Sequence, residues 1–372
     1  GVKGLSLFLV PKFLLDEDGN PGPRNDVQCT AIEHKLGVRG SPTTTLVHGD
    51  HGGSTGYLIG ELGRGLEIMF IMMNSARLSV GTEGLGVAQR AGQLAAEYAR
   101  ERIQGSAGGE RVAIVRHPDV RRLLMTQRCH SEAIRALAYG IAALQDVAHH
   151  AVAAADRESA RRRVDLLTPV LKGWSTESAV DLCSMAIQVF GGMGFIEESG
   201  IAQYLRDARI TPIYEGTTAI QAADLAGRKI ARDGGAALAE LILEMRETAA
   251  ALHQAGEPAL TVTGERLADS LDHLEAATRS LLRKMDRADG EGLAIAEPFL
   301  KLFGTALGGW QMGKAAVLAA KAIAGGSDDP YYPWKIAAAG FYADHLLPKT
   351  AALLITIEAD HQRLLALPDE AF

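Results

Sequence analysis

The sequence has 372 residues, of which 47% are hydrophobic and 22% are charged, and its formal net charge is -7. This composition is typical of a soluble globular protein with two or three domains. The acidic balance argues against a nucleic-acid-binding surface, and the apolar runs are shorter than the roughly 20 residues that a membrane-spanning helix needs. Three widely spaced cysteines without a CxxC pair favour reduced thiols in a cytoplasmic protein.

Residues 1–62 predict β structure. Short apolar runs alternate there with Gly, Asn and Pro, and the clearest turn covers residues 16–23. Four strand candidates of this length rarely form a domain by themselves. We therefore expect the segment to be the C-terminal part of a β domain, with its first strands and an N-terminal domain absent from the chain.

A helical period begins at Gly65 and predicts a helix of about 38 residues. The elements expected after it are a loop over residues 105–111, a second helix, a charged connector over 156–163, a third helix over 166–190 and a short helix starting near Gly216. Together these helices predict a bundle over residues 63–232.

Residues 233–372 predict a second helical bundle, because apolar stripes at helical spacing indicate four helices of similar length. No residue cluster in this segment demands chemistry, so packing or an oligomer contact is its expected role. The expected fold class is α+β but mostly α: a β remnant over 1–62, a four-helix bundle over 63–232 and an extra C-terminal bundle over 233–372.

The candidate chemistry lies in residues 187–221, where the second of two glycine-rich turns presents Glu215 between Tyr214 and Gly216. If apolar neighbours exclude water from Glu215, its carboxylate becomes a stronger base. Gly216 would let a substrate approach the backbone closely, and Thr217 opens a helix whose free N–H groups suit a phosphate or a carbonyl oxygen. Such a site could remove a proton α to a carbonyl, although an acid beside a glycine is more often a solvated surface turn.

Several ordered motifs extend this argument. They are GVRGSPT (37–43), YARERIQG (98–105), QVFGGMGF (188–195), RDARI (206–210) and IYEGT (213–217). In their order and spacing they resemble the acyl-CoA dehydrogenase family. MFIMMNSAR (69–77), RIQG (102–105) and the added C-terminal bundle most resemble the branch of that family that contains 3-methylmercaptopropionyl-CoA dehydrogenase.

The resemblance implies an FAD enzyme, a homodimer or a dimer of dimers, that desaturates a saturated acyl-CoA substrate. One candidate substrate is 3-methylmercaptopropionyl-CoA. Glu215 would remove the α-proton while the β-hydride leaves for the flavin, and the Glu215 backbone N–H with a flavin ribityl hydroxyl would polarise the thioester carbonyl. An electron-transfer flavoprotein or a similar carrier would then accept the electrons.

The resemblance also implies cofactor contacts. Arg102 would bind the FAD pyrophosphate of a partner subunit, Gln188, Gly191 and Gly192 would hold the adenosine half across the dimer, and Thr217 would bind the FAD of its own subunit. From the residues alone, Arg102 is equally a solvated helix arginine, and the alternative for the glycine pair is a plain helix end.

The substrate contacts that the resemblance implies are Asn74, Arg77, Tyr214 and Gly216. Asn74 stands where the family commonly has Asp in the helix that contacts CoA. Ala76 stands where two other branches carry their base, so Glu215 is the motif-matched candidate here. RIQG is one residue shorter than the usual RxQFG of the family.

Two alternatives stay open. An acyl-CoA oxidase would differ in whether oxygen reaches the reduced flavin. A non-catalytic or DNA-binding relative is disfavoured by the acidic balance and by the intact Glu215, whereas a basic groove or an occluded Glu215 would favour it.

Overall fold

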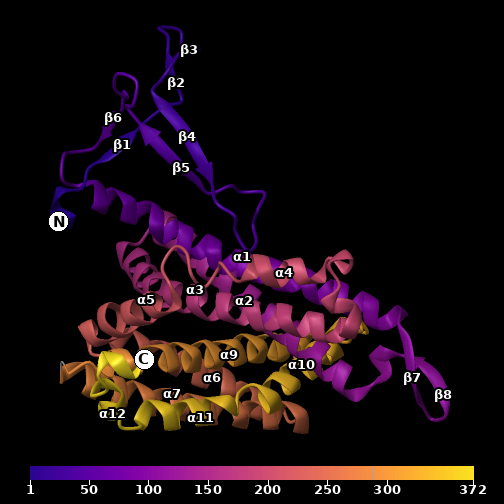
Figure 1. Ribbon diagram of the computed structural model, residues 1–372. Coiled ribbons are helices and arrows are strands. Elements are labelled where there is room, and N and C mark those ends of the chain that lie inside the picture. The colour runs from indigo at the N-terminus through magenta and orange to yellow at the C-terminus, as the bar shows by residue number, and fades with distance from the viewer. Residues whose placement is uncertain (288) are drawn as a thin grey trace. The chain divides into compact units, whose positions relative to one another are not determined.

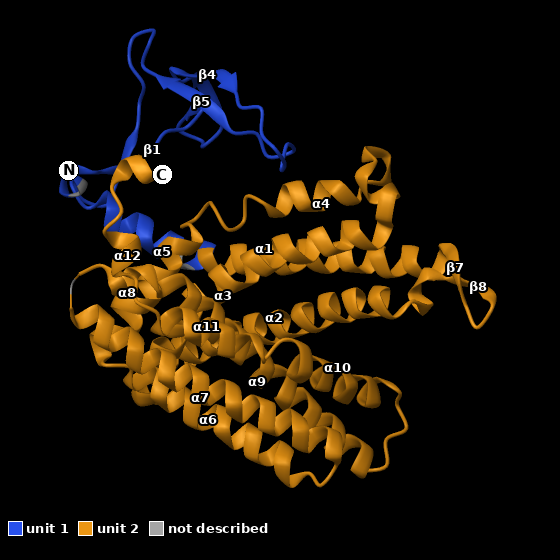
Figure 2. Cartoon of the chain, turned by 60° about the horizontal axis from the view of Figure 1, so that its bottom comes forward, with its two compact units in different colours: residues 1–76 blue, residues 77–372 orange. Residues whose placement is uncertain are grey.

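The computed structural model describes residues 1–287 and 289–372, with Val2 and Asn74 described by their backbone only. The chain divides into two compact units, residues 1–76 and 77–372, and the boundary falls inside α1 (Gly65–Glu101) (Figure 2). The first unit contains most of the strands, and the second is mostly helical (Figure 1). The expected class, mostly α with a small β part, is confirmed.

Three antiparallel strand pairs form the unit of residues 1–76. The pairs are β1 (Leu7–Leu9) with β6 (Tyr57–Ile59), β2 (Phe13–Leu15) with β3 (Pro21–Arg24), and β4 (Val27–Ile32) with β5 (Thr44–His48). The sequence predicts four strands here; the β2–β3 hairpin was missed because β3 contains two prolines, which are poor strand residues. The expected turn between them forms, and Asp16 Oδ1 accepts the N–H groups of Asp18 and Asn20.

Three long helices begin the helical part of the chain: α1, α2 (Pro118–His150) and α3 (Ala154–Phe190). The loop expected over residues 105–111 is instead a hairpin of β7 (Ile103–Ala107) and β8 (Glu110–Ala113), which reverses at Gly108 and Gly109 with φ of +62° and +88°. The charged connector expected over residues 156–163 was also wrong. These residues form the first turns of α3, with most of their charged side chains exposed.

The first glycine-rich turn follows α3 as a short 3-10 segment, Gly191–Phe195. Next come α4 (Ile201–Ala208), which the sequence did not predict, and α5 (Thr218–Ala223), the short helix expected near Gly216. The chain continues from α5 as a π-helical segment, Asp224–Ile230.

The C-terminal helices are α6 (Ala236–Gln254), α7 (Pro258–Asp286), α8 (Glu291–Ala294), α9 (Ala296–Ala324), α10 (Tyr331–His345), α11 (Lys349–Glu358) and α12 (Gln362–Leu365). The last apolar stripe, expected to be one helix, is divided among α10, α11 and α12, and its first break falls between α10 and α11. Pro348 explains the break, because it has no N–H to donate and disfavours helical backbone at the preceding residue.

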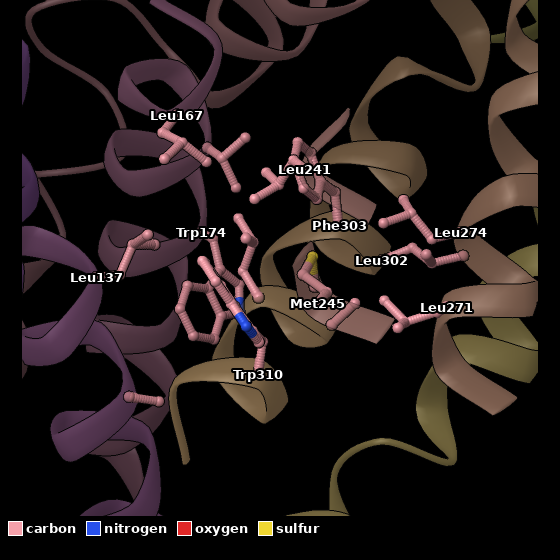
Figure 3. Close-up of a cluster of buried hydrophobic side chains, with 14 of the residues drawn as sticks. Leu137, Leu167, Trp174, Leu241, Met245, Leu271, Leu274, Leu302, Phe303 and Trp310 are labelled. Atoms are coloured by element: carbon pink, nitrogen blue, oxygen red, sulfur yellow. The ribbon is translucent and has the colours of Figure 1, made fainter. Parts of the chain in front are cut away.

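One buried hydrophobic cluster joins the earlier helices to the C-terminal ones (Figure 3). Trp174 of α3 and Leu137 of α2 share it with Met245 of α6 and with Phe303 and Trp310 of α9. The helices of residues 118–190 and 236–358 therefore pack around a common core.

The helical stretch Ala154–Phe195 is long and apolar enough, by length and composition alone, to cross a membrane. The central helix of a soluble bundle passes the same test, so this property is weak support for a membrane span. In this chain α3 buries Leu166, Val170, Leu171 and Trp174 among the other helices.

Candidate functional site

Glu215 lies on a tight turn between α4 and α5. Its φ is +54° and that of Gly216 is +95°. A left-handed backbone costs a non-glycine residue about 1–2 kcal/mol, and such a conformation persists where its surroundings hold it in place. The turn is closed by the Thr218 N–H, which donates to the Pro212 carbonyl oxygen at 3.0 Å. The side chain of Glu215 is half-buried, so its carboxylate remains accessible.

The backbone of this turn offers unused donors. Among the hydrogen bonds of the described residues, none is donated by the N–H groups of Glu215, Gly216 or Thr217. Free N–H groups beside a carboxylate can bind a carbonyl oxygen on which negative charge develops. The turn therefore combines a proton acceptor with hydrogen-bond donors for an oxyanion.

Polar side chains of α1 and α3 form hydrogen bonds with the turn. Lys172 Nζ of α3 donates to the Gly216 carbonyl oxygen at 2.6 Å, and Thr218 Oγ1 donates to Glu177 Oε1, also at 2.6 Å. The Tyr214 hydroxyl donates to Glu83 Oε2 of α1. These hydrogen bonds anchor the turn on both sides of Glu215.

Burial perturbs two ionisable groups of this network. It lowers the pKa of Lys172 to about 8, because the buried ammonium group loses hydration; Glu177 opposes this effect and Arg77 adds to it. Burial also raises the pKa of Tyr214, and its hydrogen bond to Glu83 raises that pKa further. The Tyr214 hydroxyl therefore stays protonated and remains a donor to Glu83.

A second ionic group lies beside the start of the π-helical segment. Arg77 is 7% exposed, and its Nη1 contacts Asp224 Oδ2 at 3.2 Å. Asp224 Oδ1 accepts from Arg228 Nε at 2.6 Å. Arg77 thus has a buried carboxylate partner, and its expected contact with CoA stays a prediction. The Asn74 side chain, the other expected CoA contact on this helix, lies outside the described part of the chain.

Gly216 and Thr217 have separate structural reasons for their identity. A Cβ at position 216 would collide with the amide of Gln221, which is fully buried. That amide has no hydrogen-bond partner among the described residues. Thr217 is the N-cap of α5, and its Oγ1 accepts the Ile220 N–H at 3.3 Å.

Arg102, Gly191 and Gly192 line a separate cavity of about 710 Å³. Its other walls include Tyr98 and Phe190, whose rings stack with centroids 4.2 Å apart and tie the end of α1 to the end of α3. Glu215 does not line this cavity. The structure therefore brings Arg102 and the glycine pair together and places them apart from the Glu215 turn.

This cavity suits the pyrophosphate half of a dinucleotide. Arg102 is exposed and takes part in no ion pair among the described residues. Its Nη2 donates to Gln104 Oε1 at 3.4 Å, and the rest of its guanidinium is available to an anion. A Cβ at Gly191 or Gly192 would meet nothing within 4 Å, which leaves open space beside the backbone. Gln188, the fourth expected contact, is exposed in the last turn of α3 and is not among the residues that line the cavity.

The supporting residues of the turn, Lys172, Glu177 and Glu83, were missed by the sequence analysis. Lys172 gave one usable signal, because it interrupts the apolar residues 166–174 and a lysine inside an apolar run needs a partner. Glu83 and Glu177 gave none. Glutamates are common on exposed helix faces, and only the packing of α1 and α3 brings these two to the turn.

Comparison with known proteins identifies the family. Residues 63–230 match the acyl-CoA dehydrogenase C-terminal domain, and residues 241–368 match the acetyl-CoA dehydrogenase C-terminal-like domain. The chain belongs to the acyl-CoA dehydrogenase family. Members of this family are FAD-dependent oxidoreductases.

Two curated acyl-CoA dehydrogenases match almost the whole chain. The 3-methylmercaptopropionyl-CoA dehydrogenase of Ruegeria pomeroyi is 43% identical over 98% of this chain and 60% of its own length. The broad-specificity linear acyl-CoA dehydrogenase FadE5 of Mycobacterium tuberculosis is 37% identical over 100% of this chain and 64% of its own length. The chain thus spans 60–64% of the length of these relatives.

The crystal structure of Caenorhabditis elegans ACDH-11 in complex with C11-CoA has the same fold. Its TM-score is 0.71 at 23% identity, and the match covers 96% of this chain and 58% of that chain. At this level of identity, the likeness establishes the acyl-CoA dehydrogenase fold of the chain.

Proposed function

We propose that this chain supplies the catalytic base and part of the cofactor site of an FAD-dependent acyl-CoA dehydrogenase that introduces an α,β double bond into a saturated acyl-CoA thioester. The observation that carries the proposal is the Glu215 turn. It presents an accessible carboxylate on a left-handed backbone beside unused N–H donors. Family membership supplies the reaction class.

In this proposal Glu215 removes the α-proton of the acyl group. The thioester carbonyl oxygen gains negative charge as the C–H bond breaks, and the free Glu215 N–H stabilises that charge. Gly216 leaves the turn without a side chain where the thioester approaches. Tyr214 holds the turn on α1 through Glu83.

The residues for FAD belong to two places. Arg102, Gly191 and Gly192 would hold the pyrophosphate and adenosine half in the 710 Å³ cavity, with Gln188 close by on α3. Thr217 would contribute its hydroxyl near Glu215. When bound, FAD would supply the acceptor for the hydride that leaves the β-carbon.

The relatives suggest the substrate and the partners. 3-Methylmercaptopropionyl-CoA is our first candidate substrate, because the relative of that name is 43% identical; linear acyl-CoAs are the second, since FadE5 is named for them. We further propose a cytoplasmic homodimer or dimer of dimers that passes its electrons to an electron-transfer flavoprotein or a similar acceptor. Asn74 and Arg77 remain our proposed CoA contacts.

The test is an anaerobic visible spectrum of the full-length protein, recorded before and after addition of a panel of acyl-CoAs. We expect the flavin absorbance to bleach with one saturated thioester. Glu215→Gln should keep its flavin and lose this bleaching by at least 1000-fold in rate, because the amide preserves the shape but cannot take a proton.

The controls separate the alternatives. Bleaching at the wild-type rate in Glu215→Gln would overturn the assignment of the base. Hydrogen peroxide formed at the turnover rate in air would indicate an oxidase. A flavin that no acyl-CoA bleaches would favour a non-catalytic relative.

A further inference from the structure

Lys172 is a fully buried lysine in the middle of α3. An ammonium group removed from water is unfavourable unless close partners replace its hydration. Its partner here is the Gly216 carbonyl oxygen, 2.6 Å from Nζ. The lysine thus reaches from the bundle core to the residue that follows Glu215.

The backbone around Glu215 has few other attachments. Within the described residues, the hydrogen bond from Lys172 is the only one to the main chain of Glu215 or Gly216. The neighbouring anchors hold Tyr214 and Thr218, which lie on either side. Lys172 therefore fixes Gly216 directly and acts on Glu215 through the adjoining backbone.

We propose that Lys172 is a positioning residue. Its hydrogen bond from the bundle core to the Gly216 carbonyl oxygen sets the direction of the Glu215 carboxylate and backbone N–H. This inference rests on the proposed role of Glu215 as the base. Lys172 itself touches no substrate or reacting atom. Its effect passes through the peptide of Gly216.

Charged groups from each neighbouring segment face Lys172. Glu177 lies on the same helix, Arg77 approaches from α1 with Asp224 as its partner, and Glu215 lies on the turn. Burial is the largest effect and lowers the pKa of Lys172 to about 8. The side chain is therefore a cation at pH 7, and it loses its proton as the pH rises through about 8.

The melting temperature of a Lys172 variant distinguishes a positioning role from a purely stabilising one. A buried cation with a lowered pKa makes folding less favourable below that pKa, because the unfolded chain holds the proton more tightly. Lys172→Met removes this cost and keeps the length of the side chain. We therefore expect an unchanged or higher melting temperature together with a looser turn, whereas a purely structural lysine would give a lower melting temperature.

Lys284 provides a matched control. It is also buried, and its Nζ donates to the Ala359 carbonyl oxygen at the same distance of 2.6 Å. It also pairs with buried Glu291 at 3.2 Å. Lys284→Met should lower the melting temperature, because it leaves buried Glu291 with only the longer 4.0 Å contact to Arg287, and it should not alter the Glu215 turn.

The first experiment is hydrogen exchange of the full-length protein, with and without each substitution. We expect the Thr218 N–H, which closes the turn on Pro212, to exchange at least tenfold faster in Lys172→Met and at the wild-type rate in Lys284→Met. Unchanged protection in Lys172→Met would overturn the proposal. If that variant does not fold, the same measurement on the wild-type protein tests the proposal. After correction for the chemical exchange rate, the protection of the Thr218 N–H should fall between pH 7 and pH 9. Constant protection over this range would overturn the proposal.

Turnover gives the second measurement. In the flavin-loaded enzyme, Lys172→Met should lower kcat at least tenfold, with KM for the acyl-CoA within threefold of wild type; an unchanged kcat would overturn the proposal. The two hypotheses fail separately. If the wild-type protein oxidises no acyl-CoA but Thr218 exchanges faster in Lys172→Met, the dehydrogenase proposal is refuted and the positioning role of Lys172 is supported. If the wild-type protein is active and Lys172→Met changes neither kcat nor Thr218 exchange, only the positioning role is refuted.

Discussion

His130 shows how one buried side chain makes this bundle sensitive to pH. Its ring lies near those of Trp174 and Tyr342, with centroids 6.1 Å and 6.0 Å away. Its Nδ1 is buried and has no hydrogen-bond partner among the described residues. Burial, with a smaller effect from Lys349, lowers the pKa of His130 to about 4. The folded protein therefore holds this imidazole neutral at pH values where the unfolded chain protonates it.

This difference in pKa between the folded and unfolded states makes the protein less stable at low pH. Between the unfolded pKa of about 6.5 and the folded pKa, the unfolded state binds more protons, so stability is lost as the pH falls. At about 1.4 kcal/mol per unit, the loss approaches 3 kcal/mol near pH 4. His130→Phe should reduce the difference in unfolding free energy between pH 7 and pH 4.5 by about 2 kcal/mol.

Urea unfolding followed by tryptophan fluorescence measures this effect, since all three tryptophans lie in residues 77–372. The exposed His149 is the control, and His149→Phe should retain the wild-type pH dependence. An equally steep loss of stability in His130→Phe would show that other groups cause it.

At the scale of the helices, two glycines decide how closely α9 approaches its neighbours. A Cβ at Gly304 would lie 2.8 Å from Trp174 Cδ1 of α3. A Cβ at Gly308 would collide with the Tyr342 hydroxyl of α10, which donates to the Thr305 carbonyl oxygen at 3.0 Å. Glycine lowers helix propensity, but here it makes room for two large aromatic side chains against the backbone of α9.

Gly304→Ala should destabilise the protein by about 1–3 kcal/mol, because the added methyl group overpacks the contact with Trp174. Gly140→Ala in α2 is the matched control, since a Cβ there meets nothing within 4 Å. It should stabilise the protein by about 0.5–1 kcal/mol through helix propensity alone. Thermal unfolding of both variants checks the prediction, and a stabilising Gly304→Ala would contradict the close packing.

At the scale of the whole molecule, the helices of residues 118–190 and 236–358 share one buried cluster (Figure 3). Separating them would expose Leu137, Leu167 and Trp174 on one side and Leu241, Phe303 and Trp310 on the other. Each fully buried side chain of this kind contributes about 1.5–3 kcal/mol through removal from water. Neither group of helices is expected to retain its structure after the other unfolds.

We therefore expect a single unfolding transition for all these helices. Hydrogen exchange in increasing urea should give the same midpoint for peptides from α3 and from α7. Two clearly separated midpoints would show two independently stable bundles.

The sequence by itself determined the helical periods and most of the chain reversals, and it supplied Glu215 as the candidate base. Long stripes of apolar residues fix α1, α2 and α9 because helix periodicity is a local property. Glu215 is a candidate base because its motif, together with the other ordered motifs, resembles the acyl-CoA dehydrogenase family. Short elements such as α4 and the β7–β8 hairpin were missed, since their stability comes from packing rather than from periodicity.

Only the tertiary structure decided what holds the site. It placed Lys172, Glu83 and Glu177 against the Glu215 turn, and it gathered Arg102 and Gly191 around one cavity. These residues are far apart along the chain, so no local pattern relates them. Whether these residues meet depends on which face of each long helix points away from the common core. The packing of all the helices together sets those faces.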